Sequence, residues 1–264
     1  MPASLSLETV ASAGPSFGLT IEAAKGERLA ALDQAALLEE ARRNKLVLLR
    51  GFGDVGRDEF LSWCRSFPGR APLEWAAGPV MEMAERPGAE NYLFTREAVP
   101  FHWDGAFHRV PAFLMFYCVE APAAGSGGET LFCDTEAVWR AAGEERRAEW
   151  ARTRLTFETK KLAHYGGRFA TPLADRHPET GAPILRFAEP VETAFNPVSL
   201  TIEGAREPEA LLADLRRRVY DPSVCLRHSW RKRDVLIADN HALIHGRTAY
   251  ADDSPRHLRR IQLL

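Results

Sequence analysis

The sequence predicts a mainly β protein, in which a barrel or jelly roll is flanked by helices. From about residue 78 onward, short apolar segments alternate with turns rich in glycine and proline, as in antiparallel β architectures. Helical spacing of apolar residues is confined to the first 67 residues and to two later stretches. Nothing in the composition marks a boundary, so we expect one domain that spans residues 1–264.

The bulk composition excludes several classes of partner. The formal net charge is -2 with 27% charged residues, so no general bias points to nucleic acid or to a membrane surface. The first twenty residues lack the features of a secretion signal, and no apolar run approaches the ~20 residues of a membrane span. The four cysteines form no CxxC pair. We therefore expect reduced thiols and a cytoplasmic location. A small-molecule substrate is the expected partner, and the sequence leaves open whether the chain forms a homo-oligomer.

The individual elements follow from local patterns. Residues 28–43 and 57–67 have helical apolar spacing, and the second segment is stopped by Pro68 and Gly69. Residues 134–151 and 207–219 are expected to be helical too, and residues 177–187 read as a turn feeding a strand. The expected strands are 45–52, 80–84, 91–94, 99–104, 112–120, 130–134, 234–245 and 256–264.

The segment FHWDGAFH, residues 101–108, carries the first candidate for chemistry. On an extended strand, His102 and Asp104 share one face, while Phe101 and Trp103 pack behind them. A histidine and a carboxylate on one face form either a hydrogen-bonded pair or two ligands of a metal ion. Two histidines and one carboxylate are the ligands of non-haem iron sites that leave positions open for a cosubstrate and oxygen.

An iron site of this kind needs one further histidine. His108 is close in sequence, whereas His245 follows a hydrophobic strand far downstream and could lie on a neighbouring strand. His241 is the competing candidate in that downstream segment. Sequence patterns alone leave these alternatives open.

The C-terminal segment SPRHLRRIQLL supplies a possible anion site. If it is a strand, then Arg256, Leu258 and Arg260 share one face. Buried arginines are costly without anions, and the planar guanidinium binds a carboxylate through two hydrogen bonds. An exposed edge strand that carries charge is the alternative.

The order HWDGAF, GGETLF, DNHALIHGR and RHLRR resembles the taurine dioxygenase-like group of iron(II)- and 2-oxoglutarate-dependent oxygenases. This resemblance covers most of the chain and implies a double-stranded β-helix, which is a distorted jelly roll with helices outside. It implies Fe(II), 2-oxoglutarate and O2 as cofactor and cosubstrates. By the resemblance, the iron ligands are His102, Asp104 and His245, Thr130 and Arg256 bind 2-oxoglutarate, and Arg260 faces the substrate or supports the cosubstrate.

A narrower resemblance concerns the substrate. NYLFTREAVPFHWDGAFH, KLAHYGG and LRFAEPV are similar to segments of oxygenases that act on amino-acid-derived isonitriles, such as those of the paerucumarin pathway. This implies a small substrate, such as an isonitrile derivative of tyrosine, and hydroxylation, desaturation or oxidative decarboxylation as the outcome. Tyr92, Phe107, Lys160 and Tyr165 are candidate substrate contacts, with core packing or a solvated basic loop as the alternative for each. A barrel that binds without catalysis and a zinc hydrolase with the same three ligands are the competing functions.

Overall fold

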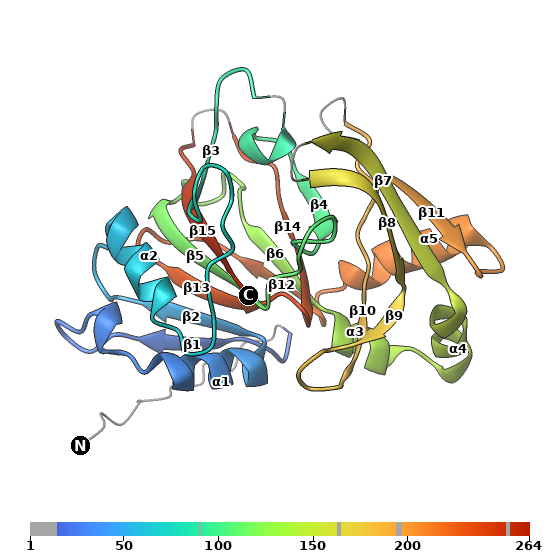
Figure 1. The fold of residues 1–264 in the computed structure, drawn as a ribbon, viewed down its shortest axis with the longest axis horizontal. Helices are drawn as coiled ribbons and strands as arrows, with labels where there is room; N and C mark the ends of the chain where they lie inside the picture. Colours follow the sequence, from blue (N-terminus) through green and yellow to red (C-terminus); the bar gives the residue numbers. More distant parts are fainter. Residues whose placement is uncertain (1–14, 90, 163–164, 194–196, 252–253) are drawn as a thin grey trace.

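The computed structural model describes residues 15–89, 91–162, 165–193, 197–251 and 254–264. It confirms a mainly β fold with helices outside (Figure 1). Within the described residues, two sheets with the strand orders β1-β2-β13-β5-β15-β3 and β12-β6-β14-β4 carry the fold. The larger sheet consists of β1 (Leu19–Glu22), β2 (Leu46–Arg50), β3 (Met81–Ala84), β5 (Phe113–Glu120), β13 (Val235–Asp239) and β15 (His257–Leu263). The smaller sheet consists of β4 (Val99–His102), β6 (Thr130–Asp134), β12 (Cys225–His228) and β14 (Leu243–Arg247).

The two sheets face each other and enclose an apolar layer. Phe116, Leu236 and Leu258 point inward from the larger sheet, and Phe132 and Leu243 do so from the smaller one. Side chains alternate along each strand, so the opposite residues of the same strands are free to contact the helices outside. This layered arrangement is the jelly roll that the sequence predicts.

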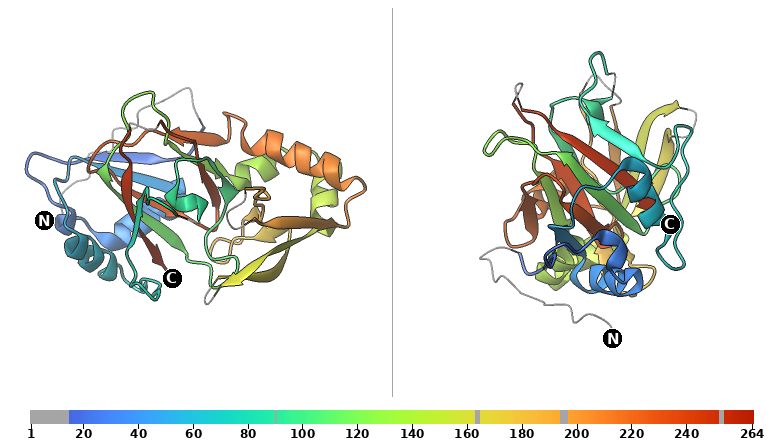
Figure 2. Two further views of the ribbon diagram at one scale, coloured as in Figure 1. Left: turned by 90° about the horizontal axis from the view of Figure 1, so that it is seen from above. Right: turned by 90° about the vertical axis from the view of Figure 1, so that its left-hand side faces the viewer.

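Helices cover the outer face of the larger sheet. They are α1 (Gln34–Asn44) and α2 (Arg57–Arg65) (Figures 1 and 2). A second cluster of buried apolar side chains joins these helices to the sheet. The helix predicted from residue 28 begins only at Gln34, because the Asp33 side chain accepts hydrogen bonds from two backbone N–H groups and caps it there. A short 3-10 helix, η1 (Leu29–Ala31), precedes the cap.

A separate group of elements packs behind the smaller sheet, at the right of Figure 1. The helix predicted over residues 134–151 is two helices in the structure, and Gly143 is the N-cap of the second one. The fully buried Trp150 and Leu215 fill the core of this group. Its elements are α3 (Thr135–Ala141), α4 (Glu144–Arg152), β7 (Arg154–Leu162), β8 (Tyr165–Pro172), β9 (Ala174–Arg176), β10 (Pro183–Leu185), β11 (Ser199–Glu203) and α5 (Pro208–Val219).

Three of the predicted strands differ from the structure in type, length or number. Residues 91–94 contain a 3-10 helix, η2 (Tyr92–Phe94), because the Asn91 side chain accepts from the Leu93 N–H and closes a local turn. The strand predicted over 99–104 ends at His102, and the turn that follows contains Gly105 with φ +88°. The predicted strand 234–245 is the pair β13 and β14 with a turn between them.

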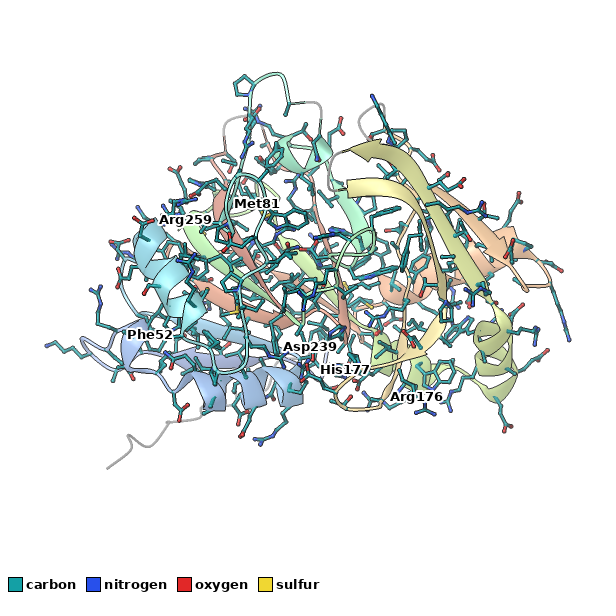
Figure 3. The ribbon with its side chains drawn as sticks, viewed as in Figure 1. Phe52, Met81, Arg176, His177, Asp239 and Arg259 are labelled. Carbon is teal, nitrogen blue, oxygen red and sulfur yellow. The ribbon has the colours of Figure 1, made fainter. Side chains whose placement is uncertain are left out.

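The turn between β13 and β14 is held by a buried polar cluster around Asp239. This carboxylate accepts from Arg42 at 2.5 Å and lies 3.1 Å from Nε2 of His177, which belongs to the turn predicted within residues 177–187 (Figure 3). Asp239 also accepts from the backbone N–H groups of His241 and Ala242. The cluster ties helix α1 and the β9–β10 turn to the loop that leads into β14. No helix in the described part of the chain has the length and apolar content needed to cross a membrane.

Candidate metal centre

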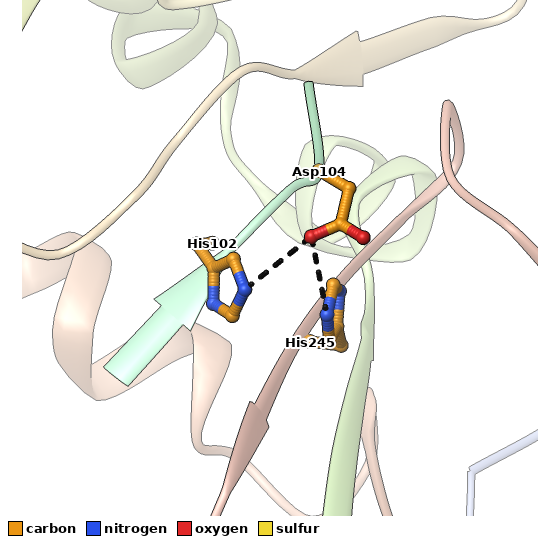
Figure 4. Close-up of side chains that lie close together, drawn as sticks. All are labelled: His102, Asp104 and His245. Carbon is orange, nitrogen blue, oxygen red and sulfur yellow. Dashed lines mark ion pairs between the residues drawn. The ribbon is translucent and has the colours of Figure 1, made fainter. Parts of the chain in front are cut away.

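Two histidines meet because two strands of the smaller sheet are paired in register. β14 runs antiparallel to β4, and His245 lies directly opposite His102, with ring centroids 4.3 Å apart. Asp104 approaches from the turn after β4, and its Oδ1 lies 3.6 Å from Nε2 of His102 and 3.8 Å from Nε2 of His245 (Figure 4). One ligand atom from each residue lies within 4.8 Å of the other two. Such a set can close around one divalent ion.

Asp104 lies beside His102 as predicted, but for a different structural reason. Asp104 lies in a turn rather than on the strand, although Phe101 and Trp103 are buried behind the site as predicted. Asn240 holds the turn, because its side chain accepts from the Asp104 N–H and donates to the Asp104 carbonyl. Gly105 permits it, since a Cβ there would lie 2.2 Å from the Arg109 carbonyl oxygen.

Gly246 allows the two histidine strands to approach. It follows His245 at an irregularity in the β14–β4 register. A Cβ on Gly246 would lie 2.7 Å from the carbonyl oxygen of Val99 on β4. Only a residue without a side chain therefore fits between the strands that carry the two imidazoles.

The surroundings put the three groups in the protonation states that a metal site requires. Burial lowers the pKa of His245 to about 3, assisted by His102, and burial also lowers the pKa of His102. Burial alone would raise the pKa of Asp104, but Arg260 and the two histidines hold it below its ordinary value. Nδ1 of His102 lies 2.9 Å from the Pro100 carbonyl, which fixes the proton there and leaves Nε2 free as a ligand. Neutral imidazoles and a charged carboxylate are the ligand forms that bind metals.

A pocket that opens to solvent adjoins the triad and is lined by His102, His245, Thr130 and Arg256 among others. Arg256 is 5% exposed and donates to the Gly128 carbonyl and to Oγ1 of Thr130. No carboxylate among the described residues pairs with this guanidinium. Burial, with the neighbouring Arg247, lowers its pKa to about 9. A buried cation without an anion, facing a cavity beside a metal triad, fits the distal carboxylate of a keto acid.

The other candidate residues of the sequence are distributed as follows. His108 is exposed and its ring contacts that of Trp75 at a tilt, and His241 accepts a hydrogen bond from Arg186, so neither belongs to the triad. Of the adjacent arginines, Arg260 lines the cavity, whereas Arg259 bonds Glu82 away from it.

The predicted substrate contacts are placed only in part. Phe107 is half-buried against Phe169, and Lys160 is exposed near the end of β7. The side chains of Tyr92 and Tyr165 lie outside the described part of the structure. The segment around Lys160, read from sequence as a loop, is the end of the β7–β8 hairpin.

Sequence reasoning missed three residues that support the triad. Asn240 holds the Asp104 turn, Gln262 donates to Asp104, and Trp75 bonds Gln262. Strand alternation could have found Gln262, because it lies on the same face of β15 as Arg260. Neither Asn240 nor Trp75 had a comparable signal.

A jelly roll that carries two histidines and an aspartate beside a buried, unpaired arginine defines the class of non-haem iron, keto-acid-dependent oxygenases. The chain belongs to the family described as taurine catabolism dioxygenase TauD, TfdA family, which matches residues 10–262. It is therefore an iron(II)- and 2-oxoglutarate-dependent dioxygenase that acts on a small molecule and uses O2.

Similar proteins of known name come from isonitrile metabolism. The chain is 40% identical over 255 residues to the 3-((Z)-2-isocyanoethenyl)-1H-indole synthase of Fischerella ambigua, covering 94% of this chain and 93% of the relative. It is 40% identical over 258 residues to the tyrosine isonitrile desaturase of Pseudomonas aeruginosa, covering 94% and 88%. The solved structure of PvcB, described as an Fe, alpha-ketoglutarate dependent oxygenase from an isonitrile synthetic pathway, superposes with a TM-score of 0.79 at 36% identity, covering 94% of this chain and 86% of that one.

Proposed function

We propose that His102, Asp104 and His245 bind the iron and that Thr130 and Arg256 bind 2-oxoglutarate. The observation that supports this most strongly is the convergence of three ligand atoms within 4.8 Å beside an unpaired, buried guanidinium. The zinc-hydrolase alternative uses the same ligands but gives Arg256 no role. The non-catalytic alternative has no support from the relatives, which are named as a synthase and a desaturase.

The proposed substrate is an isonitrile derivative of an aromatic amino acid, tyrosine or tryptophan. One relative is named for the desaturation of tyrosine isonitrile, and the other for an indole that carries an isocyanoethenyl group. The first name describes a reaction that introduces a double bond into an isonitrile, and the second describes an isonitrile that contains one. Desaturation of the side chain is therefore the proposed outcome, in preference to hydroxylation.

The roles of the chain's own residues follow from their contacts. Iron, keto acid and oxygen together supply the oxidant that removes hydrogen from a substrate C–H bond. Thr130 accepts from Nε1 of Trp230 and from Arg256, so its own hydroxyl proton is free to donate to the distal carboxylate of the keto acid. Arg256 would neutralise that carboxylate, and the buried Phe116 and Phe132, whose rings lie 6.3 Å from that of His245, exclude water from that side of the site.

Turnover with matched substrates tests this proposal. The purified protein with Fe(II), 2-oxoglutarate and O2 is expected to release succinate with the isonitriles derived from tyrosine and tryptophan, and not with the parent amino acids. Mass spectrometry of the product distinguishes loss of two hydrogens, gain of one oxygen, and additional loss of carbon dioxide. Asp104→Ala is expected to abolish succinate release, and a fully active Asp104→Ala enzyme would contradict the assignment.

We further propose that residues 1–264 act as one oxygenase domain in the cytoplasm. The four cysteines, all within the described residues, are free, and burial raises the pKa of Cys64, Cys118 and Cys133. Unpaired thiols of this kind are typical of a reducing compartment. Fractionation of the producing cells tests the location.

A further inference from the structure

The two oxygens of Asp104 have different surroundings. Oδ1 faces the two imidazoles, at 3.6 Å and 3.8 Å from their Nε2 atoms. Oδ2 faces away and accepts from Nη1 of Arg260 at 2.8 Å and from Nε2 of Gln262 at 2.6 Å. Both donors come from β15, two residues apart, and both side chains are buried. One carboxylate oxygen is therefore directed at the candidate metal position, and the other is occupied by protein donors.

The orientation of the Gln262 amide is fixed by a second contact. Nε1 of Trp75 lies 2.9 Å from Oε1 of Gln262. An indole N–H can only donate, so the amide oxygen must face Trp75 and the amide nitrogen must face Asp104. The segment that carries Trp75 is fastened along β15, since Leu73 N–H donates to the Gln262 carbonyl and Leu264 N–H donates to the Ala71 carbonyl. A flipped amide, which would place two oxygens in contact, is thereby excluded.

A carboxylate can bind a metal through one oxygen or through both. Binding through both would occupy one more coordination position, and this chemistry needs three open positions for the keto acid and oxygen. Two donors on Oδ2, one of them charged, make its coordination unfavourable because either bond would have to break. Arg260 supplies the charge, and Gln262 supplies the second donor in a fixed direction.

We propose that Gln262, oriented by Trp75, is a positioning residue that restricts Asp104 to binding the metal through Oδ1 alone and so keeps a coordination position free. This inference rests on the proposed metal site. Gln262 acts as a neutral amide that donates a hydrogen bond to the carboxylate oxygen turned away from the metal. It therefore affects the coordination of the metal and does not contact the substrate.

Metal titration of three variants tests the inference. Gln262→Leu removes the amide at similar volume, Trp75→Phe removes the indole N–H and keeps a ring, and the third variant combines them. Co(II) is added to each apo protein without 2-oxoglutarate, and both the Kd and the visible absorption, which reports the number of ligands, are recorded. Gln262→Leu frees Oδ2 from one of its two donors, so the coordination number is expected to rise and the Co(II) band to lose intensity, with a change in Kd of roughly tenfold to a hundredfold.

The double variant distinguishes positioning from general packing. Trp75→Phe alone is expected to shift the Co(II) spectrum toward that of Gln262→Leu, and to have no further effect once Gln262 is replaced. An equal effect of Trp75→Phe in both backgrounds would overturn the inference, as would an unchanged Co(II) spectrum and Kd in Gln262→Leu. Failure of the parent protein to bind Co(II) would overturn the proposed metal site itself. Thermal unfolding of each apo variant confirms that folded protein is compared.

Discussion

Gly246→Ala tests the geometry that brings the two histidines together. The added Cβ would lie 2.7 Å from the Val99 carbonyl oxygen, whereas ordinary contact begins at 3.4 Å. Strand β4 would therefore have to move by about 0.7 Å relative to β14, and His102 is on the moving strand. Gly246 is not one of the glycines with a positive φ, so alanine can adopt its backbone conformation. The expected displacement of β4 therefore comes from the lack of space between the strands and not from backbone strain.

The expected size of the effect follows from two separate requirements. Forcing extra volume between packed strands typically costs about 1–3 kcal/mol of unfolding free energy. Metal ligands must keep their distances within about 0.2 Å, so a displacement of this size is expected to reduce metal affinity by at least roughly tenfold. Urea unfolding of the apo protein measures the first quantity, and Mn(II) titration by calorimetry measures the second.

Gly143→Ala is the matched control, because nothing lies within 4 Å of a Cβ at that position. It is expected to leave Mn(II) affinity unchanged and to change the unfolding free energy by less than about 1 kcal/mol, since Gly143 is the N-cap of α4. Wild-type Mn(II) affinity in Gly246→Ala, with wild-type unfolding, would refute the reasoning.

Two further predictions concern buried charge. Arg256→Leu removes a guanidinium that has no carboxylate partner among the described residues, so the stability of the apo protein in urea is expected to stay equal or to rise. Calorimetry is expected to show 2-oxoglutarate affinity at least roughly tenfold weaker. A destabilised apo variant with normal affinity would contradict this. Burial, then Arg186, lowers the pKa of His241 from 6.5 to about 4, so the neutral form is favoured in the folded state and stability is expected to fall as pH decreases from 6.5 toward 4, by up to about 3 kcal/mol. His241→Gln should lose less stability than the wild type over that interval in urea unfolding, and an identical loss would show that His241 does not titrate as described.

The part of the site that lies on one segment could be predicted from the alternation of side chains along a strand. The FHWD pattern placed Phe101 and Trp103 behind His102, and the structure buries both. The choice among His108, His241 and His245 could not be made from spacing, because it depends on the register that sets His245 opposite His102. Strand register is a property of two distant segments and has no signal in either one alone.

The parts that sequence reasoning missed are set by turns and by side-chain partners. Asp104 was expected on a strand, but Asn240, brought close by the β13–β14 turn, holds it in a turn instead. Residues 91–94 have apolar character suited to a strand, yet the Asn91 side chain bonds the local backbone and a 3-10 helix forms. A tertiary contact decided the first outcome and a local side-chain bond decided the second, and strand propensity predicted neither.

The most direct test of the account is the visible spectrum of the protein with Fe(II) and 2-oxoglutarate in the absence of oxygen. The account predicts a weak charge-transfer band in the wild type, which arises only when the keto acid chelates the iron. The band is expected to be lost in His245→Ala and retained in His108→Ala, which removes an exposed histidine outside the triad. A wild-type protein without the band, or a His245→Ala variant that keeps it, would contradict the central claim that His102, Asp104 and His245 together hold the iron.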